Sequence, residues 1–141
     1  MPQFQFLHTA DWQIGRVFSQ FDEEDGAALA AARTDAVRRI AELAAREQVD
    51  AVLVAGDVFD AQGVRDKTVD RLFLAMAAFA GPWLLLPGNH DAALAESVWS
   101  RAQRRGVIPA NVTACLAPVP VTLPGKAVIL PAPLVQRHTY S

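Results

Sequence analysis

The chain has 141 residues, of which 52% are hydrophobic and 20% are charged, so it has the size of one globular domain and enough apolar residues for a core. This composition excludes a disordered or low-complexity chain. The formal net charge of −2 excludes a general electrostatic attraction to nucleic acid, although bound metal ions can still supply positive charge to a phosphate.

The residue pattern in the first half of the chain predicts strands that alternate with helices. Residues 3–7 alternate polar and apolar side chains as a strand does, and a polar loop then continues to about Gly26. An alanine-rich helix is expected at residues 27–47, because apolar side chains recur there at helical spacing. The short apolar run at residues 50–55 predicts a strand that is covered on both faces.

The same order repeats in the next segment. Asp66 is the expected cap of a second helix, which ends at the Gly-Pro pair 81–82, and residues 83–86 form another predicted buried strand. A third helix is expected at residues 93–105, before Gly106. Its arginines, like those of the first helix, are expected on solvated faces, with contact to DNA or a partner as the alternative.

After Pro109 the pattern changes to short strand-like runs at residues 112–116, 119–123 and 127–130. The Pro-Gly pair 124–125 is typical of a hairpin turn between the last two runs. We therefore expect the sheet to become mixed in this region. Because there is no internal repeat or linker, all elements are expected in one layered α/β domain.

The sequence carries no signal for a membrane or for secretion. The N-terminus has no basic segment followed by a cleavage-site pattern, so we expect a cytoplasmic protein. The most apolar stretch, residues 72–86, is too short to cross a bilayer and is interrupted by Gly and Pro. The single cysteine, Cys115, lies in an apolar run typical of a buried thiol, and we assign it no catalytic role.

Polar clusters follow three of the predicted strands, at the point where each strand ends. Their candidate functional residues are Asp11, Gln13, Asp57, Asp60, Asn89, His90 and Asp91. Because the carboxyl ends of neighbouring strands form one rim of an α/β sheet, we expect these clusters to converge in one crevice. Two carboxylates at one rim repel each other unless a cation lies between them, so the pattern favours a divalent metal site.

The donor atoms indicate which metal this site would hold. Oxygen ligands from Asp11, Asp57 and Asn89 favour Mn²⁺ or Mg²⁺. A carboxylate shared by two ions holds them about 3.5–4 Å apart, and Asp57 is the candidate bridge because Gly56 before it lets ligands crowd closely. The alternative for these residues is ordinary turn chemistry, since Gly-Asp and Pro-Gly-Asn sequences also form loops.

The other polar residues have expected roles around this site. His90 would face the substrate and donate a proton to the leaving oxygen or stabilise the charged transition state. Its alternative is to cap the following helix or to pair with Asp91. Asp91 or Asp60 is expected to orient His90 without touching the metal, and for Asp60 a loop role or direct ligation of the metal is the alternative. His8 and His138 are expected to be structural, His8 as a packed or hydrogen-bonded residue.

Three motifs in this order, Asp-x-(His), Gly-Asp-x-x-Asp and Gly-Asn-His-Asp, resemble the first three motifs of the calcineurin-like metallophosphoesterases. The flanking residues 7–15 and 55–60 resemble the SbcD-like DNA repair nuclease group. The resemblance implies a layered α/β sandwich with mixed sheets flanked by helices. Residues 1–141 would be the N-terminal half of this single domain, ending before the last metal-binding motifs.

The resemblance also implies an activity. The implied activity is that of a DNA exonuclease that hydrolyses phosphodiesters with two divalent ions. Mn²⁺ is the expected ion, and Mg²⁺ is the alternative. Asp11, Gln13, Asp57 and Asn89 would be the metal ligands and His90 the catalytic residue. The implied partners are DNA and an SbcC-type coiled-coil ATPase. Formation of a homodimer is a further alternative. The alternatives are a small-molecule phosphodiesterase or phosphatase, and a degenerate phosphoesterase that serves as a protein-binding scaffold.

The sequence departs from the family pattern in two places. The family usually has a histidine where this chain has Gln13, whose amide oxygen is a weaker and harder ligand, and a solvated loop glutamine is the alternative. The family also supplies a lone histidine and a Gly-His-x-His motif further on, whereas this chain has only His8, His90 and His138. We therefore expect that residues 1–141 alone do not hydrolyse phosphodiesters efficiently.

Overall fold

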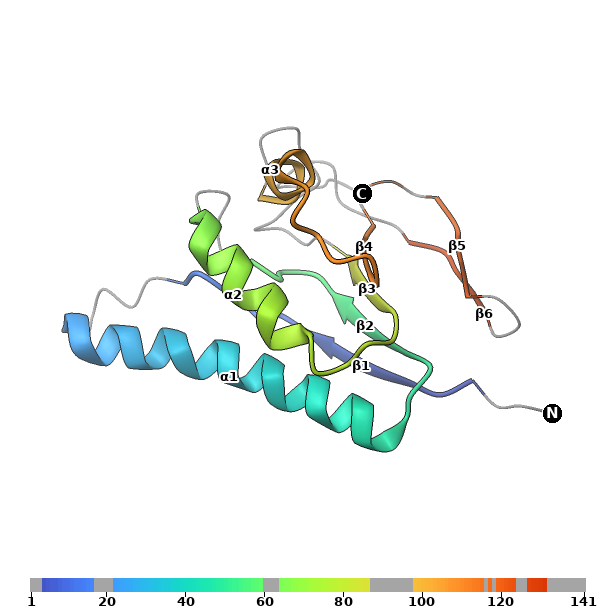
Figure 1. Ribbon diagram of the computed structural model, residues 1–141, viewed down its shortest axis with the longest axis horizontal. Coiled ribbons are helices and arrows are strands. Elements are labelled where there is room, and N and C mark those ends of the chain that lie inside the picture. The colour runs from blue at the N-terminus through green and yellow to red at the C-terminus, as the bar shows by residue number, and fades with distance from the viewer. Residues whose placement is uncertain are drawn as a thin grey trace, which may run out of the picture.

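The computed structural model shows helices packed on a parallel sheet (Figure 1). It describes residues 4–16, 22–59, 64–86, 98–115, 117, 119–123 and 127–131. Four strands pair in the order of the chain, and each pair is parallel. They are β1 (Phe6–Ala10), β2 (Ala51–Ala55), β3 (Trp83–Leu86) and β4 (Val112–Ala114). The alternation of strands and helices therefore produces the predicted α/β layer, because parallel neighbours need a crossover between them.

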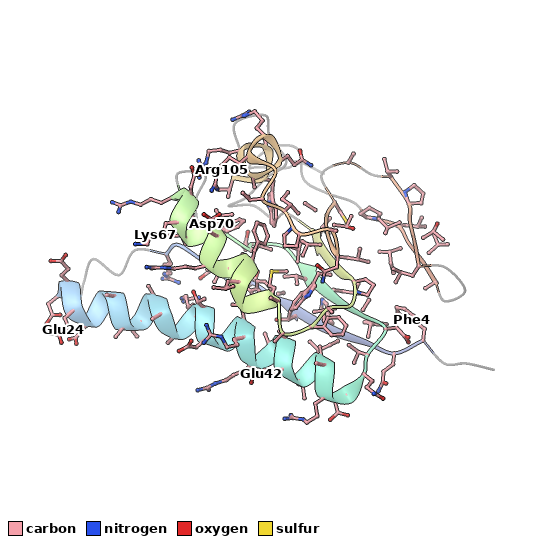
Figure 2. All side chains as sticks on the ribbon, in the orientation of Figure 1. Phe4, Glu24, Glu42, Lys67, Asp70 and Arg105 are labelled. Carbon is pink, nitrogen blue, oxygen red and sulfur yellow. The ribbon has the colours of Figure 1, made fainter. Side chains whose placement is uncertain are left out.

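Helices α1 (Glu23–Glu47), α2 (Asp66–Met76) and α3 (Val98–Arg105) follow the first three strands. The first residues of the predicted third helix lie outside the described residues. Figure 2 shows Arg105 of α3 beside Asp70 of α2, and the shortest N···O distance of this ion pair is 3.1 Å. None of the helices in the described part of the chain is both long and apolar enough to span a bilayer.

Two helix starts differ from the prediction. Helix α1 begins at Glu23 and not at Ala27, because the Asp22 carboxylate accepts a hydrogen bond from the Asp25 backbone N–H at 2.8 Å and caps it. Acidic residues in the first turn stabilise this start further. In α2 the expected cap at Asp66 is wrong, because Arg65 occupies the N-cap position and Asp66 is the first helical residue.

Strand β1 is shifted from its predicted position at residues 3–7. It runs from Phe6 to Ala10, because its residues pair in register with β2, with Phe6 beside Ala51 and Ala10 beside Ala55. His8 therefore lies within the strand and not after it, and it is exposed. Of the two expected roles of His8, packed or hydrogen-bonded, its exposure contradicts the packed one.

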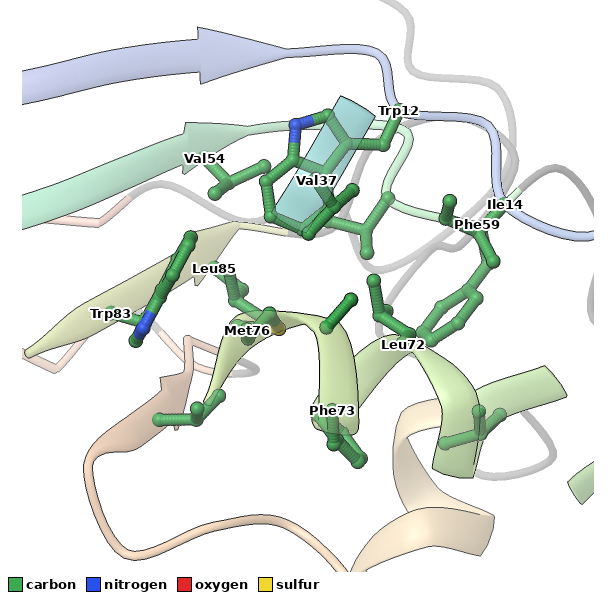
Figure 3. Close-up of a cluster of buried hydrophobic side chains, with 14 of the residues drawn as sticks. Trp12, Ile14, Val37, Val54, Phe59, Leu72, Phe73, Met76, Trp83 and Leu85 are labelled. Atoms are coloured by element: carbon green, nitrogen blue, oxygen red, sulfur yellow. The ribbon is translucent and has the colours of Figure 1, made fainter. Parts of the chain in front are cut away.

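The core lies mainly on the helix side of the sheet. Strand residues alternate between the two faces, so every second side chain points toward the helices. The labelled side chains of Figure 3 include Trp12, Val37, Val54, Leu72, Trp83 and Leu85, all of which belong to this main core. On the other face, Ala51 and Leu84 form a smaller cluster with Cys115 and Leu123. Strands β2 and β3 are thus covered on both faces, as their continuous apolar runs predict.

Strands β5 (Val121–Leu123) and β6 (Ala127–Ile129) form a separate antiparallel pair. The predicted pairing of these two runs is confirmed, while the turn at residues 124–125 lies outside the described residues. Among the described strands, the main sheet does not become mixed as expected, because β4 runs parallel to β3. The antiparallel pair instead adds its apolar side chains to the smaller cluster on the second face.

Cys115 lies just after β4, where its backbone N–H donates to the Leu85 carbonyl at 2.8 Å. The residue is 6% exposed, and burial raises the pKa of its thiol. A protonated thiol is a poor nucleophile and a poor metal ligand. This position agrees with the sequence-based prediction of a buried thiol.

Candidate metal centre

The β1–α1 and β2–α2 loops meet at the carboxyl edge of the sheet. The Asp11 backbone N–H donates to the Gly56 carbonyl at 3.2 Å, and the Gln13 N–H donates to the Asp57 carbonyl at 2.8 Å. Ile14 then forms an isolated parallel bridge with Phe59. These bonds extend the pairing of β1 and β2 beyond the strands. The two loops converge as expected, whereas the roles of their residues stay predictions.

The end of β3 reaches the same place. The Gly56 N–H donates to the Leu86 carbonyl at 2.6 Å, so the residue before Asp57 is bonded to the last residue of β3. Several candidate residues lie outside those that the structure describes, namely Asp60, Asn89, His90, Asp91 and His138. Asn89, His90 and Asp91 follow this strand end closely in sequence, and their expected roles stay predictions.

The backbone of the three described candidate ligands is left-handed. The φ angles of Asp11, Gln13 and Asp57 are 56°, 50° and 46°. Only one other described residue that is not glycine has a positive φ, and it is Gln48 at the C-cap of α1. A residue held in this region costs about 1–3 kcal/mol, and such residues concentrate at functional sites. The conformation therefore marks the same three residues that the motifs single out.

Trp12, between Asp11 and Gln13, anchors the first loop in the core. Its side chain is buried, its indole N–H donates to the Thr9 hydroxyl at 3.1 Å, and its ring meets the edge of Trp83 with centroids 5.9 Å apart. The guanidinium of Arg33 in α1 donates to the Trp12 carbonyl at 3.1 Å. Asp11, in contrast, is exposed, so the loop directs the indole inward and leaves the carboxylate residue at the surface.

The side chain of Gln13 has a partner within its own loop. The Arg16 guanidinium donates to the Gln13 Oε1 at 2.9 Å, and the Arg16 N–H approaches the Gln13 carbonyl at 3.3 Å. A dication on this amide oxygen would have to displace a positively charged group, which opposes its binding. This contact favours the interpretation of Gln13 as a loop residue over that of a ligand.

The described donors fit a hard divalent ion in part. Asp11 and Asp57 bring two carboxylates to one edge of the sheet, and oxygen is the donor that Mn²⁺ and Mg²⁺ prefer. Within residues 4–131, outside the gaps named above, no group of three or more His, Cys, Asp or Glu side chains is placed to hold a metal ion. Asn89, the remaining expected ligand, is not among the described residues.

Two arginines predicted on solvated helix faces contact the loops instead. Arg33 bonds to Trp12 as described above, and Arg101 in α3 donates to the Val64 carbonyl and, at 3.1 Å, to the Asp66 carboxylate. Helical periodicity cannot identify such residues, because a long arginine stem can leave a polar face and reach a neighbouring loop. Gly15 is the sequence signal for a close contact between these loops, because the Val64 side chain packs against its backbone where a larger residue would not fit.

Comparisons with known proteins agree with this fold. Residues 4–123 match the family model described as calcineurin-like phosphoesterase. The chain is similar to the SbcD subunit of the nuclease SbcCD of Rhodobacter capsulatus, with 38% identity over 94 residues, which cover 63% of this chain and 22% of that protein. It is also similar to the SbcD subunit of Escherichia coli K12, with 31% identity in an alignment of 143 positions that covers 94% of this chain and 33% of that protein.

A third relative, the SbcD subunit of the same nuclease in Staphylococcus saprophyticus, is 30% identical over 94 residues, which are 62% of this chain and 23% of that protein. The chain thus spans between 22% and 33% of the length of these three relatives. The family match covers all residues from β1 to β5 and agrees with the resemblance of the three motifs. This chain therefore belongs to the calcineurin-like phosphoesterase family.

Proposed function

We propose that this chain forms the first part of the metal centre of a DNA repair exonuclease that hydrolyses phosphodiesters. One observation carries the proposal. Backbone hydrogen bonds of 3.2 and 2.8 Å join the Asp11 loop to the Asp57 loop, and both residues have the left-handed backbone typical of functional sites. The chain belongs to a phosphoesterase family, and its relatives are named as subunits of a nuclease.

In this proposal Asp11, Asp57 and Asn89 would hold two divalent ions, Mn²⁺ or, as the alternative, Mg²⁺, with Asp57 as the ligand that the two ions would share. Bound ions of this kind supply positive charge to the phosphate and lower the pKa of the attacking water. Gln13 is the fourth candidate ligand and would be the weakest one, because Arg16 already bonds its amide oxygen. The family supplies further histidine ligands, and residues 1–141 alone are therefore proposed to be inactive.

His90 is the proposed catalytic residue of this chain. It would donate a proton to the leaving oxygen, which must take one up as the phosphodiester bond breaks. Asp60 and Asp91 are proposed to orient its ring by hydrogen bonding, which also fixes the nitrogen that carries the proton.

The proposed partners are DNA and a coiled-coil ATPase of the SbcC type. The relatives are named as one subunit of the nuclease SbcCD, and this name supports a second subunit. With a net charge of −2, this segment does not attract a DNA duplex by itself. The remaining attraction would come from the metal ions and from a partner surface.

The experiment that tests the proposal compares substrates in the full-length protein with and without Mn²⁺. We expect Mn²⁺-dependent release of nucleotides from linear duplex DNA, with kcat/KM higher than for a generic aryl phosphodiester. Chelation of the metal should abolish both activities. Hydrolysis of the aryl ester at the higher kcat/KM would favour the small-molecule phosphodiesterase, and the absence of any hydrolysis would contradict the proposal.

The contact between Arg16 and Gln13 supports one alternative, a degenerate phosphoesterase that serves as a protein-binding scaffold. Gln13→His in the full-length protein addresses it. Histidine tolerates the left-handed backbone of this position, and imidazole is a good ligand for transition metals. We expect the affinity for Mn²⁺ to rise on the order of tenfold. This is the lower end of the change in metal affinity that follows mutation of residues supporting a metal site.

Isothermal titration calorimetry with Mn²⁺ measures this change, and Arg16→Ala is the matched control because it frees the same oxygen without adding a ligand. Should Arg16→Ala raise the affinity as much as Gln13→His, Gln13 itself is a competent ligand. If the unmodified protein binds no Mn²⁺ but still binds a partner protein, the scaffold function is correct.

A further inference from the structure

Helix α3 contacts the connection between β2 and α2 at two points. Trp99 is fully buried, and the centroid of its ring lies 5.1 Å from that of Phe59, which follows Asp57 by two residues. Arg101, two residues after Trp99, donates from its Nε to the Asp66 carboxylate at 3.1 Å and from Nη2 to the Val64 carbonyl. Figure 2 shows that this side of α3, where Arg105 is labelled, lies beside the part of α2 that carries Lys67 and Asp70.

Val64 extends this contact to the β1–α1 loop. Its side chain is buried, and a Cβ atom added to Gly15 would lie 2.6 Å from its Cγ2 atom. Gly15 also has a φ of +88°, a conformation that favours glycine. The Val64 side chain therefore sits directly on the backbone of the loop that carries Asp11 and Gln13.

The contact of Arg101 differs from an ordinary surface ion pair. Its pair with Asp66 alone is of the ordinary kind, because half of the Asp66 side chain is exposed and Arg105 also pairs with this carboxylate at 3.5 Å, and such pairs contribute little. Arg101 also satisfies a backbone carbonyl in a partly buried position. Loss of its guanidinium would leave the Val64 carbonyl without this donor, which costs more than the loss of an exposed pair.

We propose that Arg101 is a positioning residue of the candidate metal centre. It holds Val64 against Gly15 and ties α2 to α3 through Asp66. The loop of Asp11 and Gln13 is thereby kept in register with the loop of Asp57. In this inference Arg101 acts through Val64 and Asp66 and not on the metal or the substrate, and the inference rests on the proposed function.

The test uses Arg101→Ala in the full-length protein and measures the dissociation constant of Mn²⁺ by isothermal titration calorimetry. We expect affinity to fall about ten- to a hundredfold, as it does when supporting partners of a metal site are removed. Arg101→Lys should recover part of the affinity, because its ammonium can reach only one of the two acceptors well. Arg104→Ala, an exposed arginine of the same helix, is the matched control and should bind Mn²⁺ as the wild type does.

A purely structural role would lower the melting temperature of Arg101→Ala without changing the Mn²⁺ dissociation constant of the folded fraction. That outcome overturns the inference while the proposed function stands. A wild-type protein that binds no Mn²⁺ overturns the proposed function and, with it, the role of Arg101. The two failures are therefore distinguishable.

A second pair of variants tests the same contact if Arg101→Ala does not fold. Gly15→Ala places a methyl group against Val64 and should weaken Mn²⁺ binding in the same way. Gly106→Ala is its control, because Gly106 also has a positive φ, +67°, but nothing lies within 4 Å of an added Cβ. Equal Mn²⁺ affinity in these two variants contradicts the inference.

Discussion

Asp57→Asn in the full-length protein should lower Mn²⁺-dependent phosphodiester hydrolysis by about a thousandfold, because several kcal/mol of transition-state stabilisation would be lost with a bridging carboxylate. Asparagine keeps the shape of the side chain and tolerates the left-handed backbone, which has a φ of 46° at this residue. The substitution therefore removes the negative charge and leaves the loop intact. Initial rates on duplex DNA over a range of Mn²⁺ concentrations measure the effect.

Asp35→Asn is the matched control for this variant. Asp35 lies on an exposed face of α1, where it pairs with Arg38 at 2.9 Å, and an exposed pair of this kind contributes about 0–1 kcal/mol to stability. It should retain the wild-type rate. A wild-type rate in Asp57→Asn, or an equal loss in both variants, would show that the Asp57 carboxylate is not part of the metal centre.

Trp83→Ala should lower the free energy of unfolding by about 3–5 kcal/mol, the usual cost of truncating a large buried aromatic residue. Trp83 is fully buried, and its ring meets those of Trp12 and Phe79 edge to face, with centroids 5.9 Å apart in each case. Its indole N–H also donates to the Phe79 carbonyl at 3.1 Å. Truncation would leave a cavity beneath Trp12, which anchors the loop of Asp11 and Gln13.

Urea denaturation followed by tryptophan fluorescence and circular dichroism measures this loss. Leu74→Ala is the control, because Leu74 lies on α2 with 74% of its surface exposed, and its change should stay within about 0.5 kcal/mol. A loss of similar size in the two variants would contradict the position of Trp83 in the core. Because Trp12 loses its support, we also expect Trp83→Ala to bind Mn²⁺ more weakly.

The buried strands of this fold are the elements that the sequence predicts best. Strands β2 and β3 lie where their continuous apolar runs place them, because a strand covered on both faces needs no alternation. Strand β1 is less well predicted, since its bounds depend on its pairing with β2 and not on its own pattern. The start of α1 is predicted too late because Gly26 looks like a loop residue, although Asp22 caps the helix before it.

The candidate site is predictable to the extent that topology determines it. The convergence of Asp11 and Asp57 follows from parallel strands whose carboxyl ends share one edge. The bond between Arg16 and Gln13 and the contact between Arg101 and Val64 do not follow from any local pattern, because they depend on how loops and helices pack in three dimensions. The roles of Asn89 and His90 stay predictions, since these residues lie outside the described part of the chain.

The bridge between Ile14 and Phe59 lowers the entropic cost that ion binding would have at this edge of the sheet. It extends the hydrogen-bonded ladder past the ends of β1 and β2, so Asp11 and Asp57 are carried by the sheet itself and not by free loops. These backbone hydrogen bonds do not depend on an ion, so we expect little conformational entropy to be lost on binding. Unlike a zinc finger, which unfolds when its metal leaves, this edge of the sheet should keep its shape in the apo protein.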